Sequence, residues 1–242
     1  MFLEKLTMDN FINIDFNLKN LDRYQIRTAI FNALKNTLPL LNGDLLDIGC
    51  GKMPYRNYIL KNSKVENYVG LDLETALVYD DQVKPDVYWN GITMPFEDNS
   101  FDCAFGTEVL EHCPEPEVVL KEVYRVLKPE GVFFFTVPFL WNLHEVPHDE
   151  YRYTPFSLDR HLKSSGFADI TLKATGGWHA SMALMLGLWV KRSSMSSRKR
   201  IILSRVLKPL IKRLIDLDKP EAVHFIEDQM ITGLYGIVRK RT

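Results

Sequence analysis

The sequence predicts an α/β fold in which a mostly parallel sheet carries helices on both faces. Three observations predict it. Short apolar strands alternate with helical segments, a glycine turn follows the first strand, and the chain is long enough for one continuous core. It has 242 residues, of which 46% are hydrophobic and 25% charged, an ordinary globular composition.

The first half of the chain alternates between the two kinds of element. Apolar residues at near-helical spacing predict a helix over 21–38, ended by Pro39. Strands are then predicted at 44–48, 68–73, 86–89, 101–106 and 132–137, with helices at 55–60 and 116–127. The segment Lys128–Gly131 (KPEG) is expected to end the second of these helices with proline and glycine.

The second half adds one helix over 155–165, capped at Gly166, and two final strands at 170–174 and 231–239. The stretch between those strands is too long for an unstructured loop, so two helices are predicted there, at 178–191 and 198–217. The expected organisation is a single domain over 1–242, with an N-terminal helical cap at 1–40 and a helical insertion at 176–229.

The segment Leu45–Gly51 (LLDIGCG) is the most informative stretch. A hydrophobic strand runs into Asp47, Gly49 and Gly51, and glycines let the backbone turn sharply and approach a ligand closely. In such a sheet this loop lies at the carboxyl ends of the strands, where ligands bind. Asp72 ends the next strand, where a carboxylate accepts hydrogen bonds from ribose hydroxyls.

A dinucleotide-binding fold is the rival interpretation of this loop. Its fingerprint needs a third glycine at position 54, which is Pro54 here. A pyrophosphate also prefers a helix N-terminus without an acidic neighbour, whereas Asp47 suits a cationic ligand. These residues argue against a nucleotide-dependent oxidoreductase.

Together with Asp47, Gly49, Gly51 and Asp72, segment 45–167 as a whole resembles the class I S-adenosylmethionine (SAM) dependent methyltransferases. The resemblance rests on Leu46–Gly51, Pro95–Asp102 (PFEDNSFD), Glu108–His112 (EVLEH) and Arg125–Gly131 (RVLKPEG). It implies a Rossmann-like seven-stranded sheet with an antiparallel last strand, here with a helical insertion before that strand. It also implies SAM as cofactor and S-adenosylhomocysteine as product.

The resemblance also implies roles for single residues. Asp47, Gly49 and Gly51 would surround the methionine part of SAM, and Asp72 and Leu73 would hold the adenosine. Thr107 and Glu108 would lie near the transferred methyl group. The family often has aspartate beside the adenine, where this chain has Asn90-Gly91, and an asparagine can pair with the adenine edge as donor and acceptor.

The segment Pro138–Thr154 supplies the candidates for chemistry on the acceptor. It holds His144, His148 and Asp149 among aromatic residues, at the rim where an acceptor would bind. Either histidine suits a general base at neutral pH, with Asp149 orienting it. The segment resembles one in methyltransferases of bacterial surface-glycan gene clusters, which suggests O-methylation of a sugar or glycan-related metabolite.

Two metal interpretations arise nearby. His144–His148 (HEVPH) matches the zinc protease expression HExxH, but that motif needs a helix, which Pro147 would break. Glu108, Glu111 and His112 could hold a divalent cation or bond locally, and the sequence leaves the metal unknown.

Charge is unevenly distributed. Residues 191–213 carry nine basic and no acidic side chains, although the net charge is −1. The segment 180–217 combines this run with apolar helices, which fits peripheral contact with an anionic membrane; a lid, a dimer contact or a solvated surface are the alternatives. Nucleic acid is not expected, because interleaved aromatic residues are missing.

Three cysteines without paired spacing and an N-terminus unlike a secretory signal predict a reduced, cytoplasmic protein, with the inner membrane face as a further option. The main alternative to an enzyme is a non-catalytic module that binds SAM, a membrane or a partner. The sequence identifies neither the acceptor nor the oligomeric state.

Overall fold

The computed structural model describes residues 11–74 and 83–241, so the first ten residues of the predicted cap lie outside the described residues. The chain forms two compact units. Within the described residues, the first, called the sheet unit, comprises 34–74, 83–137, 144–172 and 235–241; the second, called the hairpin unit, comprises 11–33, 138–143 and 173–234. The division into one domain with a cap and an insertion stays a prediction.

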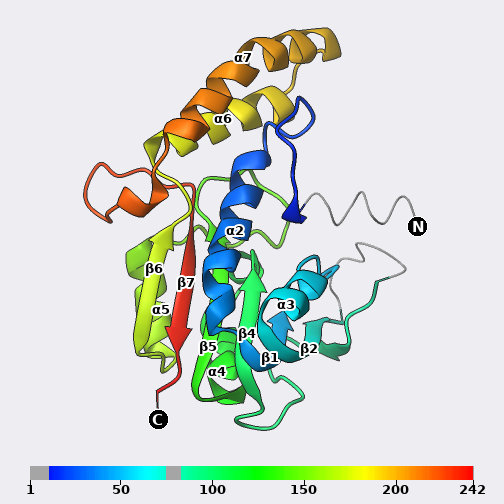
Figure 1. Ribbon diagram of the computed structural model, residues 1–242, viewed down its shortest axis with the longest axis vertical. Helices are drawn as coiled ribbons and strands as arrows, with labels where there is room; N and C mark the ends of the chain where they lie inside the picture. Colours follow the sequence, from blue (N-terminus) through cyan, green and yellow to red (C-terminus); the bar gives the residue numbers. More distant parts are fainter. Residues whose placement is uncertain (1–10, 75–82, 242) are drawn as a thin grey trace. The chain divides into compact units, whose positions relative to one another are not determined.

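A seven-stranded sheet has the order β3-β2-β1-β4-β5-β7-β6. Its strands are β1 (Asn42–Ile48), β2 (Lys64–Leu73), β3 (Val87–Trp89), β4 (Phe101–Thr107), β5 (Leu127–Pro138), β6 (Asp169–Ala174) and β7 (Gly233–Arg239). The strands β3, β2, β1, β4 and β5 are parallel neighbours, and β7 runs opposite to β4 (Figure 1). The predicted fold class is confirmed.

The sheet is held together by apolar side chains that its strands bury on both faces, as expected for parallel strands. Phe133, Phe134 and Phe135 of β5 are at most 2% exposed, and the Phe134 ring stacks on Phe105 of β4 with centroids 5.6 Å apart. This core fixes the ends of β1, β4 and β5, from which the polar residues discussed below project.

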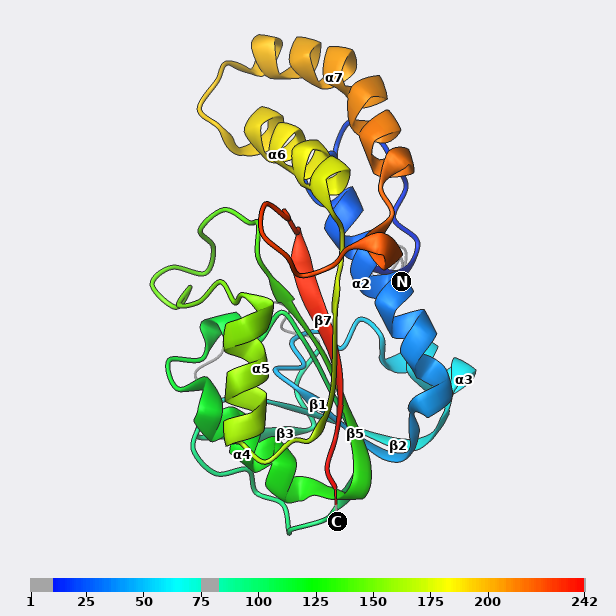
Figure 2. The ribbon, with the colours of Figure 1, turned by 90° about the vertical axis from the view of Figure 1, so that its left-hand side faces the viewer.

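Three helices belong to the sheet unit as predicted. The helix α3 (Arg56–Asn62) packs against β2, and α4 (Pro116–Val126) packs against α5 (Pro155–Ser164) on the other face of the sheet (Figure 2). The hydroxyl of Thr154 caps α5 by accepting from the Ser157 amide at 3.2 Å. The predicted cap at Gly166 has a φ of 103°, which favours glycine.

The prediction that KPEG ends a helix is wrong. The helix α4 ends at Val126, and residues 128–131 belong to β5. Phe101 pairs with Leu127 but Cys103 pairs with Val132, so these residues form a bulge. The Lys128 ammonium lies 2.7 Å from the Asp102 carboxylate, which anchors the bulge to β4.

The hairpin unit contains α6 (Trp178–Arg192), α7 (Ser197–Leu217) and the 3-10 turn η3 (Pro220–Ala222). Both predicted insertion helices are confirmed. They pack against each other around Leu21, Ala183 and Ile211 (Figure 2). Asp218 accepts from the amides of Gly177 and Ala180 at 3.0–3.2 Å, which satisfies the start of α6.

Two elements lie between residue 21 of the described chain and the first strand. The helix α2 (Tyr24–Thr37) confirms the first predicted helix, and the 3-10 turn η1 (Leu38–Leu40) follows it. No helix in the described part of the chain is long and apolar enough to cross a membrane.

Candidate functional site

The glycine loop directly after β1 has the backbone shape that the sequence predicts. Gly49 and Gly51 have φ values of 61° and 47°, in the left-handed region that favours glycine. A Cβ on Gly49 would lie 2.7 Å from the Val109 side chain. The loop therefore depends on both glycines, and it lies at the carboxyl edge of the sheet.

Asp72 at the end of β2 is joined to this loop. Its Oδ2 accepts from the Gly51 amide at 2.9 Å, and its Oδ1 accepts from the Leu73 amide at 2.8 Å. The carboxyl is 9% exposed, and burial raises its pKa. The Leu73 side chain is 37% exposed. The structure thus brings together Gly51, Asp72 and Leu73, three of the residues predicted to bind the cofactor.

Asp47 is 3% exposed, and Tyr68 donates a hydrogen bond to its Oδ2. Burial raises the pKa of Asp47 to about 8, and burial together with the Asp47 charge raises that of Tyr68. The sequence analysis did not single out Tyr68. Tyr68 pairs with Leu45, two positions before Asp47 on the adjacent strand, and this register is known only from the structure.

The predicted adenine side of the site is the turn at Asn90-Gly91. The side-chain oxygen of Asn90 accepts from the amides of Ile92 and Thr93 at 2.9 and 3.0 Å, and Gly91 has a φ of 80°. The oxygen therefore stabilises the turn itself. Only the side-chain amide nitrogen is left to face a ligand, so Asn90 offers a donor here rather than a donor and an acceptor.

Thr107 is the last residue of β4, and Glu108 directly follows it. Both residues were predicted to lie near the transferred methyl group. Its Oε1 accepts from the Thr136 hydroxyl at 2.8 Å, and its amide donates to the Thr136 carbonyl at 3.0 Å. Burial raises the pKa of Glu108 to about 7. Its φ of 56° is unusual for a non-glycine residue, and such strain concentrates at functional sites.

The 3-10 turn η2 (Leu110–His112) adds a second carboxyl group and an imidazole. Glu111 is fully buried, and burial followed by the Glu108 charge raises its pKa well above the ordinary value. His112 Nδ1 lies 2.8 Å from the carbonyl of His148. Its Nε2 lies 3.8 Å from Glu111 Oε1 and 3.8 Å from Glu145 Oε2.

The loop after β5 contributes His144 and Asp149, which the sequence predicted as partners. Nδ1 of His144 lies 3.3 Å from Oδ2 of Asp149, and the same oxygen accepts from the His144 amide at 3.1 Å. Arg152 donates to both Asp149 oxygens at 2.6 and 2.8 Å and lowers the pKa of Asp149 to about 2. Burial lowers the pKa of His144, so this imidazole is neutral at pH 7.

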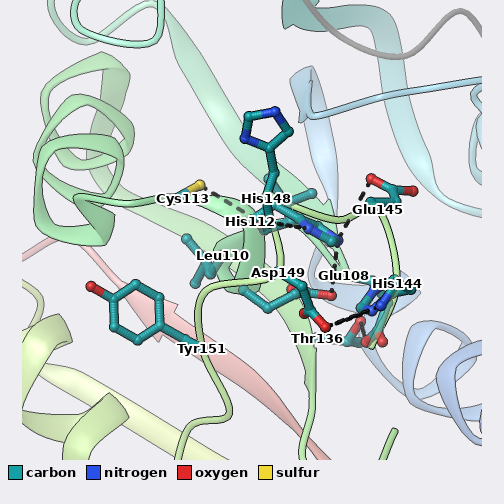
Figure 3. Close-up of polar contacts among 12 residues, drawn as sticks. Glu108, Leu110, His112, Cys113, Thr136, His144, Glu145, His148, Asp149 and Tyr151 are labelled. Carbon is teal, nitrogen blue, oxygen red and sulfur yellow. Dashed lines mark hydrogen bonds and ion pairs between the residues drawn. The ribbon is translucent and has the colours of Figure 1, made fainter. Parts of the chain in front are cut away.

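His148, the other histidine predicted as a base, is exposed, and its ring points away from His112 and His144 (Figure 3). Only its backbone carbonyl contacts His112, through Nδ1 of that ring. Residues 144–148 are not helical, which agrees with the argument against a zinc protease motif. The sequence did not show that His112 and His144 would meet; their ring centroids are 4.7 Å apart.

Comparisons with known proteins bear on the fold and on the segment around the glycine loop. Residues 46–135 match the family model described as a methyltransferase domain. The 24-methylenesterol C-methyltransferase 2 of Arabidopsis thaliana is 35% identical over 99 residues, which are 37% of this chain and 27% of that protein. This chain spans about a quarter of the length of the sterol methyltransferases it matches.

Two solved structures share the fold. A SAM-dependent methyltransferase from Archaeoglobus fulgidus superposes with a TM-score of 0.55 at 16% identity, covering 98% of this chain and 99% of that one. Phosphoethanolamine N-methyltransferase 2 of Haemonchus contortus, in complex with SAM, has a TM-score of 0.55 at 16% identity and covers 97% of this chain and 60% of that one.

Residues 46–135, which hold the glycine loop, thus match a methyltransferase domain, and the sheet has the fold of a solved SAM-dependent methyltransferase. The residues present fit this cofactor. Asp47 is a buried carboxyl suited to a cationic group, and Asp72 lies where ribose hydroxyls would bind.

Proposed function

We propose that this protein transfers a methyl group from SAM to an oxygen of a small polar acceptor, with sugars and glycan-related metabolites as the substrate class. One observation carries the proposal most directly. The neutral imidazole of His144 is paired with the fixed carboxylate of Asp149 in the loop after β5, at the sheet edge that holds Asp47 and Asp72. Such a pair suits removal of a hydroxyl proton.

The residues would divide the chemistry between them. When bound, SAM supplies an electrophilic methyl group whose bond to sulfur breaks with the electron pair staying on sulfur. His144 takes the acceptor's hydroxyl proton while the acceptor oxygen bonds to the methyl carbon. Asp149, held by Arg152, stabilises the imidazolium that results. Asp47 and Asp72 would hold the ammonium and the ribose and so align the two reactants, because a cation beside Asp47 favours its ionised form.

The aromatic residues of the same loop support a sugar as acceptor. Tyr151 is 36% exposed and stacks on Tyr153 with centroids 5.3 Å apart. Exposed aromatic faces beside hydrogen-bonding groups suit polar rings. The sterol relatives methylate carbon according to their names, and identification of the methylated atom in the product distinguishes transfer to oxygen from transfer to carbon.

Contact with an anionic membrane is proposed in addition, through the hairpin unit. On α6 the exposed side chains of Trp178, Met182, Met185 and Trp189 recur at helical spacing. On α7 the exposed apolar residues are Ile201, Ile202, Val206, Leu210 and Leu217. Nine basic and no acidic residues in 191–213 accompany them, a combination that favours anionic lipid and a lipid-linked acceptor.

Calorimetric titration with SAM, S-adenosylhomocysteine and NAD, repeated on Asp72→Ala, tests the cofactor. Binding of the first two that weakens in the variant supports the proposal, and a preference for NAD overturns it. A screen of nucleotide sugars and glycolipids with labelled SAM then tests the acceptor. SAM binding without transfer to any acceptor would favour the alternative, a non-catalytic SAM-binding module.

A further inference from the structure

Three side chains of the sheet unit lie close together, although no hydrogen bond among the described residues joins them to one another. Glu111, His112 and His144 each offer one ligand atom, and these atoms all lie within 4.8 Å of one another. We infer that the three residues bind one divalent transition-metal ion. The two glutamates and His112 of the motif EVLEH did not by themselves indicate this set, because His144 lies far away in sequence.

Glu111 is the first argument for a cation. Its side chain is fully buried, and neither carboxyl oxygen has a hydrogen-bond partner within the described ranges 11–74 and 83–241. The nearest ring nitrogen, Nε2 of His112, is 3.8 Å away, beyond hydrogen-bond distance. Burying a carboxylate without a partner is costly, so an ion beside it would offset that cost.

The two histidines are arranged as metal ligands usually are. Nδ1 of His112 faces the His148 carbonyl at 2.8 Å, and Nδ1 of His144 faces Asp149 at 3.3 Å. A ligating histidine typically donates its other nitrogen to a carbonyl or carboxylate, which fixes the ring and the tautomer. For His112 this contact would leave Nε2 as the ligand atom, whereas Nδ1 of His144 has no hydrogen-bond partner among the described residues. Arg152 in turn fixes Asp149 with two hydrogen bonds.

The ligand chemistry selects the kind of ion. Two imidazoles and one carboxylate suit Zn²⁺, Mn²⁺ or Fe²⁺, whereas Mg²⁺ and Ca²⁺ prefer oxygen. Bonds of about 2.1 Å require the ligand atoms to approach by roughly 1 Å, a small side-chain movement. The Glu145 carboxyl, 3.8 Å from His112 Nε2, adds negative charge beside the site. Three protein ligands leave a coordination position for another oxygen.

This inference also deepens the proposed function, on which its catalytic part rests. With the ion bound, His144 would be a ligand, and the ion would replace it in promoting loss of the hydroxyl proton. The ion would lower the pKa of a hydroxyl at the fourth position by stabilising the alkoxide, and the proton would leave to water. Binding of the ion itself does not depend on methyl transfer and can be measured alone.

The experiment is titration of the metal-stripped full chain with Zn²⁺ and Mn²⁺, measured by calorimetry, with Mg²⁺ for comparison. Glu111→Gln keeps the size of the side chain and removes its charge, and His144→Ala removes one imidazole. His148→Ala is the matched control, because that exposed ring points away from the cluster (Figure 3). Absorption spectra with Co²⁺ provide a second readout of the ligand set.

One equivalent of Zn²⁺ or Mn²⁺ is expected in the wild type and in His148→Ala. Both cluster variants should lose more than the roughly 10–100-fold in affinity that loss of an outer partner costs. No ion in the wild type, or equal affinity in all variants, would overturn the inference. Either variant alone decides the test if the other does not fold. Intact SAM binding and transfer without an ion would reject the metal site and leave the proposed function standing.

Discussion

The Tyr68 hydroxyl donates a hydrogen bond to the Asp47 carboxyl, and both side chains are buried at adjacent strands of the sheet. Tyr68→Phe would leave this carboxyl without that donor. The expected loss in the free energy of unfolding is about 1–3 kcal/mol, the usual cost of a buried group that loses its partner. Urea denaturation measures it. Tyr88→Phe, at a tyrosine that is 45% exposed, should change stability little.

Asp47 should also make stability depend on pH. Its pKa rises from an ordinary 3.8 to about 8 in the folded protein, so between these values the folded state holds a proton that the unfolded state has lost. The contribution is full below pH 4 and declines by about 1.4 kcal/mol per pH unit as pH rises towards 8. The difference between wild type and Asp47→Asn, measured by urea denaturation across this range, isolates it. If the wild type instead gained stability relative to Asp47→Asn as pH rises, the raised pKa of Asp47 would be contradicted.

The hydrogen bonds of Asp72 lead to a prediction for cofactor affinity. Asp72→Ala removes the acceptor for the Gly51 and Leu73 amides together with the proposed ribose contact. Bonds to a charged group contribute about 1.5–3 kcal/mol, so the affinity for S-adenosylhomocysteine should fall about 10–100-fold. Calorimetry measures this. Glu74→Ala, at the exposed residue two positions later, should bind as the wild type does.

The two histidines of the acceptor loop should behave differently. His144→Ala should reduce turnover about 10²–10⁴-fold while SAM affinity stays unchanged, because the loss falls on the proton transfer or on the ion that promotes it. His148→Ala should turn over normally. A radiolabelled methyl-transfer assay with a screened acceptor compares them. Equal losses in both variants would show that the loop needs both rings for its shape.

The hairpin unit leads to a prediction for vesicle binding. Co-sedimentation should be stronger with phosphatidylglycerol vesicles than with phosphatidylcholine vesicles, and it should weaken as salt rises. Trp189→Glu combined with Ile202→Glu places charge on both exposed apolar stripes and should abolish it. Phe156→Glu, at a side chain that is 67% exposed on α5, is the control. Equal binding by all three proteins would reject a membrane surface.

Periodicity and turn residues were enough to predict most of the fold. They predicted α6 and α7 nearly to the residue, because apolar spacing over such length has one interpretation. They failed at KPEG, where proline and glycine can end a helix or form a bulge, and only pairing of Cys103 with Val132 decides between these.

Some contacts of the candidate site could be predicted from the sequence and others could not. The contact between Asp72 and Gly51 follows from the order of adjacent parallel strands, which a motif can reveal. The meeting of His112 with His144 depends on how a long loop folds back onto η2, and no local pattern encodes that path. The role of Tyr68 depends on strand register, which periodicity does not fix.

The loop after β5, residues 139–154, is attached to the sheet unit in a way that has a consequence for engineering. The amides of Glu150 and Tyr151 both donate to the Glu111 carbonyl, at 2.9 and 3.1 Å. The hydroxyls of Tyr151 and Tyr153 donate to the carbonyls of Pro114 and Leu110, each at 2.9 Å. Every acceptor is a main-chain carbonyl, which any residue type supplies. Segments grafted from other proteins with these two tyrosines retained should therefore seat on the same scaffold, so that acceptor preference can be exchanged while the cofactor loop stays untouched.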